Sequence, residues 1–233
     1  MRIATDRPHA TIWVDVKITI SKENYLKTIA EAESEGEVVK ASTLVRWLNV
    51  TPPAVTMAIK RLRRDALINV DSEGQLTLTG SGREIATRLL QRHHLIERML
   101  TEIFGMEWYK VHDEAEQLEH AVSADFERRL VEKLGGDAAC PHGNRVEADT
   151  PHQRRARGLL PLSDLTASGR AQVISVFERD RKLLEYLNGL GIHPGTRLEV
   201  VSKNYDETLT LRIADAAVQL GSAAAAKIWV QPM

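Results

Sequence analysis

The period of the apolar positions changes several times along the chain, and each change predicts a different element. Residues 11–20 alternate apolar with polar side chains, which is typical of a β-strand or an extended arm. Helical spacing then predicts helices over 21–35 and 40–48. A third helix is expected after a break that contains two prolines, and it ends near Asp65.

Two short apolar runs, 66–70 and 75–79, flank a turn-forming segment and predict a β-hairpin. Helical spacing then resumes and predicts two long helices, over 81–104 and 111–134. The first part of the chain is therefore predicted to contain three helices, a hairpin and two longer helices.

The character of the sequence changes again near residue 160. Residues 145–158 are polar and basic without an apolar period, and they predict a linker. Beyond them, a helix is expected over 182–190 among several short strands, which indicate a small β-barrel. The expected strands are 173–176, 197–201, 208–213 and 227–230.

Composition narrows the class of protein. The chain has 233 residues, is 43% hydrophobic and carries a single cysteine, Cys140, which excludes an internal disulfide framework and fits a reducing compartment. No apolar run approaches the roughly 18–20 residues of a membrane span, and the first residues lack the layout of a secretory signal. We therefore expect a cytoplasmic protein.

Charge is balanced overall, with a net charge of −1, but it is unevenly distributed. Four basic and no acidic residues lie between Thr51 and Arg64. Ten acidic and five basic residues lie between Ile96 and Leu134. A basic segment followed by an acidic one that carries histidines suggests a DNA contact and a cation site in one chain, although both can be ordinary solvated faces.

The order helix, turn, helix, hairpin is that of a winged helix-turn-helix. One helix fits the DNA major groove, which is about 12 Å wide, and its first turn faces the base edges while later basic residues reach phosphates. The tip of the hairpin is acidic, which argues against base reading by the wing. The candidate DNA-binding residues are Thr51, Pro52, Ala54, Thr56 and Met57 for bases, and Lys60, Arg61 and Arg64, beside Arg63, for phosphates.

Histidines and carboxylates share helix faces in the acidic segment. Four of them stand at i, i+4, i+7 and i+8 of one predicted helix, within about a third of its circumference: His112, Glu116, Glu119 and His120. On the preceding helix His93 and Glu97 lie one turn apart, and antiparallel packing would bring the two groups together. Imidazole and carboxylate ligands suit Mn²⁺ or Fe²⁺, and also bind Zn²⁺ or Co²⁺. Cys140 is interpreted as a structural thiol.

Several segments strongly resemble the diphtheria toxin repressor and manganese transport regulator family. They are Arg92–Arg98, Lys110–His120, the Cys140-Pro141-His142-Gly143-Asn144 turn and the Thr79–Arg83 turn. Residues 160–233 resemble the FeoA-like β-barrel of many members, most clearly at Gly189–Gly195. The resemblance implies a homodimer that binds palindromic operators when loaded with Fe²⁺ or Mn²⁺.

The resemblance also implies two metal sites. By position, Glu116, Glu119 and His120 match ligands of the primary site, and His93, Glu97 and His112 match those of a neighbouring site. The position of Glu116 is usually Cys in the iron branch and Glu in the manganese branch, so Mn²⁺ is favoured.

Three positions depart from the family's pattern or extend it. Asn24 stands where the family has a Met or Asp ligand, and its amide oxygen can coordinate without charge. Lys27 replaces a carboxylate of the manganese branch, which disfavours a second cation there. Asp180, with Glu178 close by, falls near an acidic ligand that some members supply from the barrel.

The expected fold is mostly helical with a small β part. It divides into an arm (1–20), a winged helix-turn-helix (21–92), a helical dimerisation and metal-binding domain (93–144), a linker (145–159) and a FeoA-like β-barrel (160–233). The dimer surface is expected on Leu95, Met99, Leu118 and Phe126.

The expected function is a DNA-binding transcription regulator that depends on Mn²⁺ or Fe²⁺ and represses metal-uptake genes. One alternative is a metal-dependent hydrolase, although the sequence has no HExxH motif, P-loop or nucleophile elbow. The other is a metal-storage or interaction module that binds no DNA.

Overall fold

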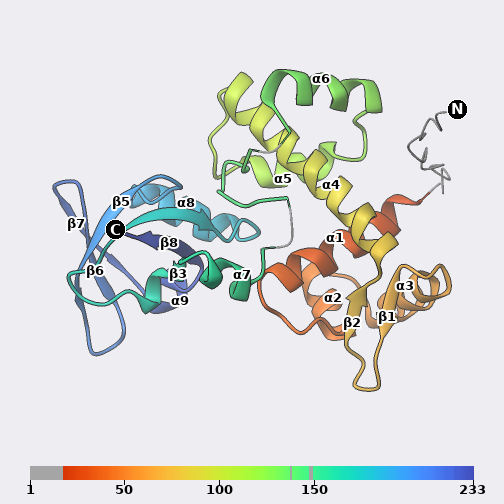
Figure 1. Ribbon diagram of the computed structural model, residues 1–233, viewed down its shortest axis with the longest axis horizontal. Coiled ribbons are helices and arrows are strands. Elements are labelled where there is room, and N and C mark those ends of the chain that lie inside the picture. Colours follow the sequence, from red (N-terminus) through yellow and green to blue (C-terminus); the bar gives the residue numbers. More distant parts are fainter. Residues whose placement is uncertain (1–17, 137, 147–148) are drawn as a thin grey trace, which may run out of the picture.

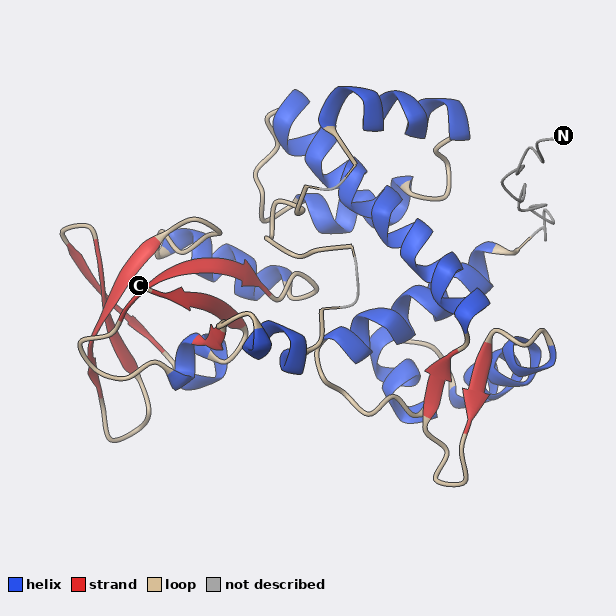
Figure 2. Cartoon of the chain, viewed as in Figure 1, coloured by secondary structure: helices blue, strands red, loops and turns tan. Residues whose placement is uncertain are grey.

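The computed structural model describes residues 18–136, 138–146 and 149–233. These residues form three bodies, each with its own apolar core: a helical part with a hairpin, a second helical part and a β-rich part (Figure 1). Figure 2 shows that the strands gather almost entirely in the third. Residues 11–17 of the strand or arm expected over 11–20 lie outside the described residues. Of the remainder, residues 18 and 19 form no strand and Ile20 opens the first helix.

The first body is built around α1 (Ile20–Ser34), which begins where the Thr19 side chain accepts a hydrogen bond from the backbone N–H of Lys22. Every residue from Tyr25 to Ala32 is buried, so this helix is covered on all sides. One of its faces joins the core of the first body, and the polar residues Lys27 and Glu31 are covered as well. Burial of these charges requires partners from elsewhere in the chain.

Two short helices and a hairpin complete this body. α2 (Ala41–Leu48) ends at Asn49, which adopts a left-handed conformation with φ 50°. α3 (Pro52–Arg64) carries two prolines in its first turn, where no intrahelical donor is lost. It buries Val55, Ala58 and Leu62 and leaves its other face exposed. The strands β1 (Ile68–Val70) and β2 (Leu76–Leu78) pair antiparallel, and the predicted winged helix-turn-helix is confirmed.

The long helix α4 (Gly80–Arg98) leads into the second body and ends in a single π-helical turn, Met99–Ile103. The helix expected over 111–134 is wrong as one element, because the chain forms α5 (Val111–Leu118) and α6 (Ala124–Leu134). The Ser123 side chain accepts a hydrogen bond from the N–H of Phe126 and starts the second helix.

The third body is a six-stranded antiparallel sheet with the order β3-β8-β4-β5-β6-β7, and it confirms the expected small β-domain. Its core includes Leu184 and Leu187 of α8 (Arg181–Gly189). The strands are β3 (Leu160–Pro161), β4 (Arg170–Val176), β5 (Arg197–Lys203), β6 (Leu209–Ile213), β7 (Ala216–Leu220) and β8 (Ile228–Pro232). β3, β7, a 3-10 turn (Leu162–Asp164) and the four-residue α9 (Ser222–Ala225) were not predicted.

Part of the predicted linker is also helical. α7 (Pro151–Ala156) starts with a capping box in which Thr150 and Gln153 each satisfy the other's backbone N–H. Arg154 of this helix is buried and lies 3.4 Å from Glu35 Oε1, just after the end of α1. The segment therefore packs between the first and third bodies. No helix of the described residues is long and apolar enough to cross a bilayer.

The Cys140–Asn144 turn fastens the β-domain to the rest of the chain. The backbone N–H of Val176, the last residue of β4, donates to the carbonyl of His142 at 3.0 Å. Gly143 has φ +82°, and a Cβ at this position would lie 1.9 Å from the carbonyl oxygen of Ile174. Only glycine allows the turn to approach β4 so closely.

Gly143→Ala should therefore destabilise the protein by about 3 kcal/mol or more, because it combines backbone strain with a backbone clash. Gly74→Ala is the matched control, since Gly74 has φ +77° but nothing within 4 Å of a Cβ. That control should cost only about 1–2 kcal/mol. Denaturant unfolding of both variants checks this, and equal losses would show that the close approach to β4 has no role.

Candidate metal centre and nucleic-acid interface

The end of α5 meets α1 at a cluster of polar side chains. His120 Nε2 lies 2.6 Å from Asn24 Oδ1 and 3.4 Å from Glu119 Oε1. Its other ring nitrogen, Nδ1, lies 3.1 Å from Glu23 Oε2. The structure therefore brings together three of the residues that the sequence predicted for one site. Glu23 was missed, although its position beside Asn24 on α1 could have suggested it.

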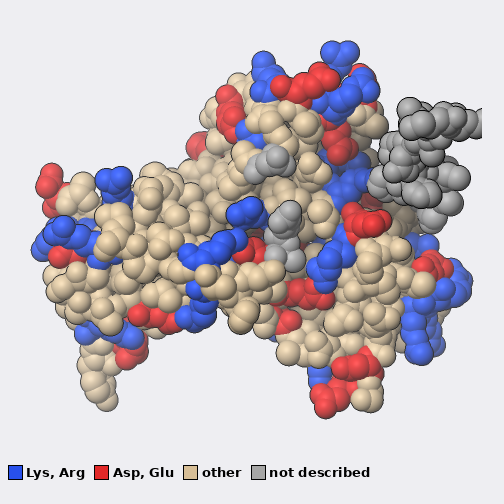
Figure 3. Space-filling model, viewed as in Figure 1, with Lys and Arg blue, Asp and Glu red and all other residues tan. Residues whose placement is uncertain are grey.

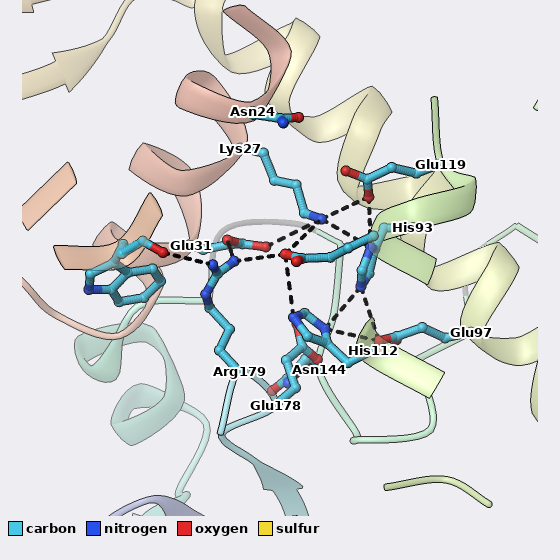
Figure 4. Close-up of polar contacts among 12 residues, drawn as sticks. Asn24, Lys27, Glu31, His93, Glu97, His112, Glu119, Asn144, Glu178 and Arg179 are labelled. Carbon is cyan, nitrogen blue, oxygen red and sulfur yellow. Dashed lines mark hydrogen bonds and ion pairs between the residues drawn. The ribbon is translucent and has the colours of Figure 1, made fainter. Parts of the chain in front are cut away.

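Glu116, the fourth predicted member, faces the same region from a greater distance. Its Oε1 atom lies 3.3 Å from Arg179 Nη1 and 3.6 Å from His112 Nε2. Arg179 also donates to Glu31 Oε2 at 2.6 Å, and its guanidinium carbon lies 5.1 Å from the centre of the Trp47 ring. Figure 4 shows Arg179 reaching from the β-domain toward Glu31 of α1. A pocket here is lined by Asn24, Lys27, Thr28, Trp47, Leu48, Glu116, Glu119 and Arg179.

A second cluster lies deeper, where α4 packs against α5. His93 Nε2 is 3.0 Å from both Glu97 Oε1 and His112 Nδ1, and His112 Nδ1 is 3.2 Å from the same carboxylate oxygen. All three side chains are buried. The spacing on two predicted helices was thus sufficient to place these residues together.

His93 also connects the two clusters. Its Nδ1 atom lies 2.7 Å from Glu119 Oε2 and 3.0 Å from Lys27 Nζ, while Nε2 faces Glu97 (Figure 4). A single imidazole therefore has one nitrogen in each cluster. Arg92, its neighbour on α4, donates to the carbonyl of Glu119 at 3.2 Å and holds the end of α5 in place.

A third group of ligand-type side chains adjoins Glu97 and includes a residue of the β-domain. Cys140 Sγ lies 3.4 Å from Glu178 Oε2, and His142 Nδ1 lies 3.4 Å from Glu97 Oε1 and 3.5 Å from Glu178 Oε2. His94 belongs to the same buried group. Sequence reasoning took Cys140 for a structural thiol, although the spacing of a cysteine and a histidine in one turn could have indicated ligands.

Asp180 lies elsewhere. Its carboxylate accepts a hydrogen bond from the N–H of Leu183 at 3.0 Å and starts α8, and it pairs with Lys227 at 3.3 Å. Glu178, two residues earlier, is the carboxylate that enters the third group, where it accepts a hydrogen bond from Asn144 Nδ2 at 2.7 Å. The β-domain therefore contributes an acidic group at Glu178 and not at Asp180.

Four buried polar atoms in and beside these clusters have no hydrogen-bond partner within the described part of the chain. They are Glu31 Oε1, Glu97 Oε2, His94 Nδ1 and His142 Nε2. Unsatisfied groups of this kind are costly inside a protein, and a cation or an ordered water would satisfy them. Imidazole, carboxylate and thiol groups that converge in this way fit a divalent metal ion.

Positive charge already lies within these clusters. Lys27 Nζ donates to Glu119 Oε2 at 2.8 Å, and both side chains are only 3% exposed. Burial alone lowers the pKa of Lys27, but the surrounding carboxylates, Glu31 and Glu119 foremost, outweigh burial and raise that pKa above its ordinary value. Lys27 is therefore an ammonium ion at neutral pH.

Two histidines are also held in the charged form. Burial lowers the pKa of His142, but Glu97 and Glu178 outweigh it and raise the pKa to about 10. For His93, burial and the charge of Lys27 lower the pKa, yet Glu97 and Glu119 raise it to about 9. Burial raises the pKa of Glu97, and the nearby histidines, His142 foremost, reverse that effect and hold the pKa well below its usual range. The clusters are networks of paired charges.

The exposed face of α3, together with its N-cap residue Thr51, carries all the residues predicted to contact DNA. Thr51, Pro52, Ala54, Thr56, Met57, Lys60, Arg61 and Arg64 are all exposed. Figure 3 shows Lys and Arg side chains over α3 and acidic side chains at the tip of the β1–β2 hairpin. The helix therefore presents small and polar groups in its first turn and basic groups after it, as a recognition helix does.

A winged helix joined to buried imidazole, carboxylate and thiol clusters is the architecture of a DNA-binding regulator that responds to a metal ion. Three family models match the chain in order. They describe the N-terminal DNA-binding domain of iron-dependent repressors (residues 17–76), their metal-binding and dimerisation domain (79–147) and the FeoA domain (160–232).

Known proteins agree with these matches. A diphtheria toxin repressor of Corynebacterium glutamicum is 33% identical over 190 residues, which cover 78% of this chain and 83% of that protein. The iron-dependent repressor IdeR of Mycobacterium tuberculosis is 32% identical over 189 residues, with 76% and 82% covered. The chain belongs to the iron-dependent repressor family, and it is a transcriptional repressor and not an enzyme.

Solved structures show the same fold. A manganese-dependent transcriptional repressor in complex with manganese aligns with a TM-score of 0.81 and 31% identity, covering 91% of this chain and all of that one. The manganese regulator SloR aligns with a TM-score of 0.73 and 27% identity, covering 93% and 100%. The alignments span all three bodies described above.

The raised histidine pKa values predict how stability depends on pH. A histidine whose pKa rises on folding stabilises the protein fully below its unfolded pKa, about 6.5, and that contribution disappears as the pH rises through the folded value. With metal removed by EDTA, the melting temperature should therefore fall from pH 6.5 toward pH 10, through the pKa values of about 9 for His93 and about 10 for His142. Thermal melts across this range check the prediction.

His142→Asn should make that fall shallower, because it removes one of the two raised histidines. His152→Asn is the control, since His152 is exposed on α7 and should leave the wild-type slope unchanged. Identical slopes for wild type and His142→Asn would contradict the assignment of a raised pKa to His142.

Proposed function

We propose that this repressor binds DNA only when a divalent metal ion, Mn²⁺ in preference to Fe²⁺, holds α1 against the end of α5. The observation that carries this proposal is the approach of Asn24 on α1 to His120 and Glu119, which follow α5 directly, with 2.6 Å between His120 Nε2 and Asn24 Oδ1. The named relatives are iron-dependent and manganese-dependent repressors. We propose that DNA binding by this chain depends on a metal ion in the same way.

Two ligand sets are proposed. The first consists of Asn24, Glu116, Glu119 and His120. The second comprises His94, Glu97, Cys140 and Glu178. His142 contacts Glu97 and Glu178 beside it, and His93 and His112 form a further group with the same Glu97. Asp180 is not included, because it starts α8. A bound ion supplies concentrated positive charge that draws the carboxylate and imidazole groups together.

The preference for Mn²⁺ rests on the donor atoms of the first set. Its members offer carboxylate and amide oxygens and one imidazole, with no sulfur, and hard oxygen donors suit Mn²⁺. The second set contains Cys140, whose thiol pKa is raised well above its ordinary value by burial and by the charge of Glu178. The thiolate, the form that binds metals best, is therefore unfavourable in this set until a cation compensates.

Metal binding can affect DNA binding through α1, because residues of α1 belong to the core of the winged helix. A ligand set shared by α1 and α5 fixes the winged helix relative to the second helical body. We propose that a homodimer forms through this second body, where Leu118 and Phe126 are exposed, whereas Leu95 is buried within its own chain. Two recognition helices about 34 Å apart would then read a palindromic operator.

The same proposal gives each part of the chain a role. Residues 21–92 would read the operator, 93–144 would sense metal and dimerise, and 160–233 would close the second ligand set through Glu178. We further propose that the protein acts in the cytoplasm, where it represses genes of metal uptake. A hydrolase is not favoured, because the relatives are repressors.

His120→Ala should abolish the increase in DNA affinity that Mn²⁺ produces and weaken Mn²⁺ binding by about 100-fold or more, because His120 is the only imidazole of the first set. Fluorescence anisotropy with operator DNA, in EDTA and in Mn²⁺, measures the effect. His152→Ala should behave as wild type. A His120→Ala protein that still gains affinity with Mn²⁺ would refute the first ligand set.

Lys60→Ala should weaken binding to all DNA sequences similarly. Because one phosphate contact is lost, the slope of log K against log salt concentration should become shallower by roughly 0.9. The reason is that Lys60 is exposed on α3 and is placed for a phosphate, not a base. Lys182→Ala, on the exposed face of α8, is the control. An unchanged salt slope for Lys60→Ala would exclude a phosphate contact at Lys60.

A further inference from the structure

Lys27 is enclosed by groups that bind divalent metal ions in other proteins. Its Nζ atom lies 2.8 Å from Glu119 Oε2 and 3.0 Å from His93 Nδ1. It also lies 3.9 Å from a carboxylate oxygen of Glu31 and 3.9 Å from one of Glu116. The ring of His93 and three carboxylates thus surround the ammonium group of Lys27, as Figure 4 shows for the labelled members.

The charge balance of this group requires a cation at the position of Nζ. Three carboxylates converge there, and among the described residues the ammonium of Lys27 and the guanidinium of Arg179 are the Lys and Arg charges in contact with them. Arg179 contacts Glu31 and Glu116 from the side of the β-domain, whereas Glu119 pairs with Lys27 and with His93. Without Lys27, buried carboxylates would face one another, which is strongly unfavourable.

Lys27 and Asn24 lie on adjacent turns of the same helix, and both side chains contact residues at the end of α5. Lys27 therefore lies beside the first proposed ligand set and contacts two of its members, Glu116 and Glu119. The stem of Lys27 is buried together with its ammonium group, so the charge is held inside the cluster and does not extend to solvent.

We propose that the Lys27 ammonium is the resident cation of a metal-type site formed by Glu31, His93, Glu116 and Glu119, and that it keeps a metal ion out of that site. This inference rests on the proposed function, because the excluded ion would lie next to the first ligand set. Lys27 is a residue that determines how many ions the chain binds. Replacing the ammonium by a neutral group or a carboxylate opens the site to Mn²⁺.

The test counts bound Mn²⁺ per chain by equilibrium dialysis and elemental analysis for the full-length wild type, Lys27→Met and Lys27→Glu. Both variants should bind one more Mn²⁺ per chain than wild type, and Lys27→Glu, which adds a fourth carboxylate, should bind it more tightly. Electron paramagnetic resonance should show spin coupling between neighbouring Mn²⁺ ions in the variants and none in wild type.

Lys22→Glu is the matched control, because Lys22 lies on α1 and pairs with Asp65 at 2.6 Å, away from the cluster. Its Mn²⁺ count should equal that of wild type. Equal counts for wild type and both Lys27 variants, with melting curves that show folded protein, would overturn the inference. This test measures how the number of bound Mn²⁺ ions differs between the wild type and the Lys27 variants. The proposed function fails on a different result, namely that Mn²⁺ leaves DNA binding by the wild type unchanged.

If Lys27→Glu fails to fold without metal, Lys27→Met decides the matter, since it keeps the volume of the stem and adds no charge. A rise in its melting temperature with Mn²⁺ that exceeds the rise for wild type would support the site through a separate measurement. An equal rise, together with an equal count, would show that the ammonium excludes no ion.

Discussion

The junction of the three bodies depends on matching buried negative charge with nearby positive charge. Glu97, Glu119 and Glu178 are buried where α1, α4, α5 and the β-domain meet. Taking a carboxylate out of water costs several kcal/mol unless a partner lies within hydrogen-bond reach. Here the partners are Lys27 and the histidines of the clusters, so the position of each helix is tied to the position of a charge.

Each body has its own apolar core, and Trp108 and Tyr109 of the second body also pack against the core of the β-domain. This constraint explains why the junction contains many paired charges in addition to such apolar contacts. Arg179 is the clearest case, since one guanidinium contacts α1 through Glu31 and α5 through Glu116, and donates to the carbonyl of Trp47 at 3.4 Å. Contacts of this kind respond to an added cation, whereas an apolar interface would not. A junction built from charges is therefore well suited to sensing an ion.

Periodicity predicted the winged helix and the main strands because one face of each element is buried and the other is solvated. It failed in the second helical body, where apolar spacing continues through the break between α5 and α6. A turn over residues 119–123 separates the two helices, and its last residue, Ser123, caps α6. It also could not tell Glu178 from Asp180. These carboxylates lie two residues apart in one loop, and only the path of the chain after β4 directs one of them into the cluster.

The candidate site divides in the same way. His93, Glu97 and His112 were found because helix geometry fixes side chains one turn apart, and the contact of Asn24 with His120 agrees with the family's pattern. The participation of Cys140, His142 and Glu178 depends on contacts between residues far apart in sequence, which no local pattern encodes. The burial of Lys27 is likewise a tertiary effect. Its carboxylate partners are Glu31 of α1, Glu116 of α5 and Glu119, which directly follows α5.

Ending α5 at Leu118 also has a consequence for the backbone. The free carbonyls at the last turn of a helix carry a partial negative charge, the negative pole of the helix macrodipole, and Arg92 already donates to one of them at Glu119. This pole adjoins the side chains of Glu119 and His120 and favours positive charge there by about 0.3–1 kcal/mol. Had the helix continued to Leu134, the pole would lie about 24 Å farther along the axis, at 1.5 Å per residue. The peptide backbone itself therefore contributes to the attraction for cations.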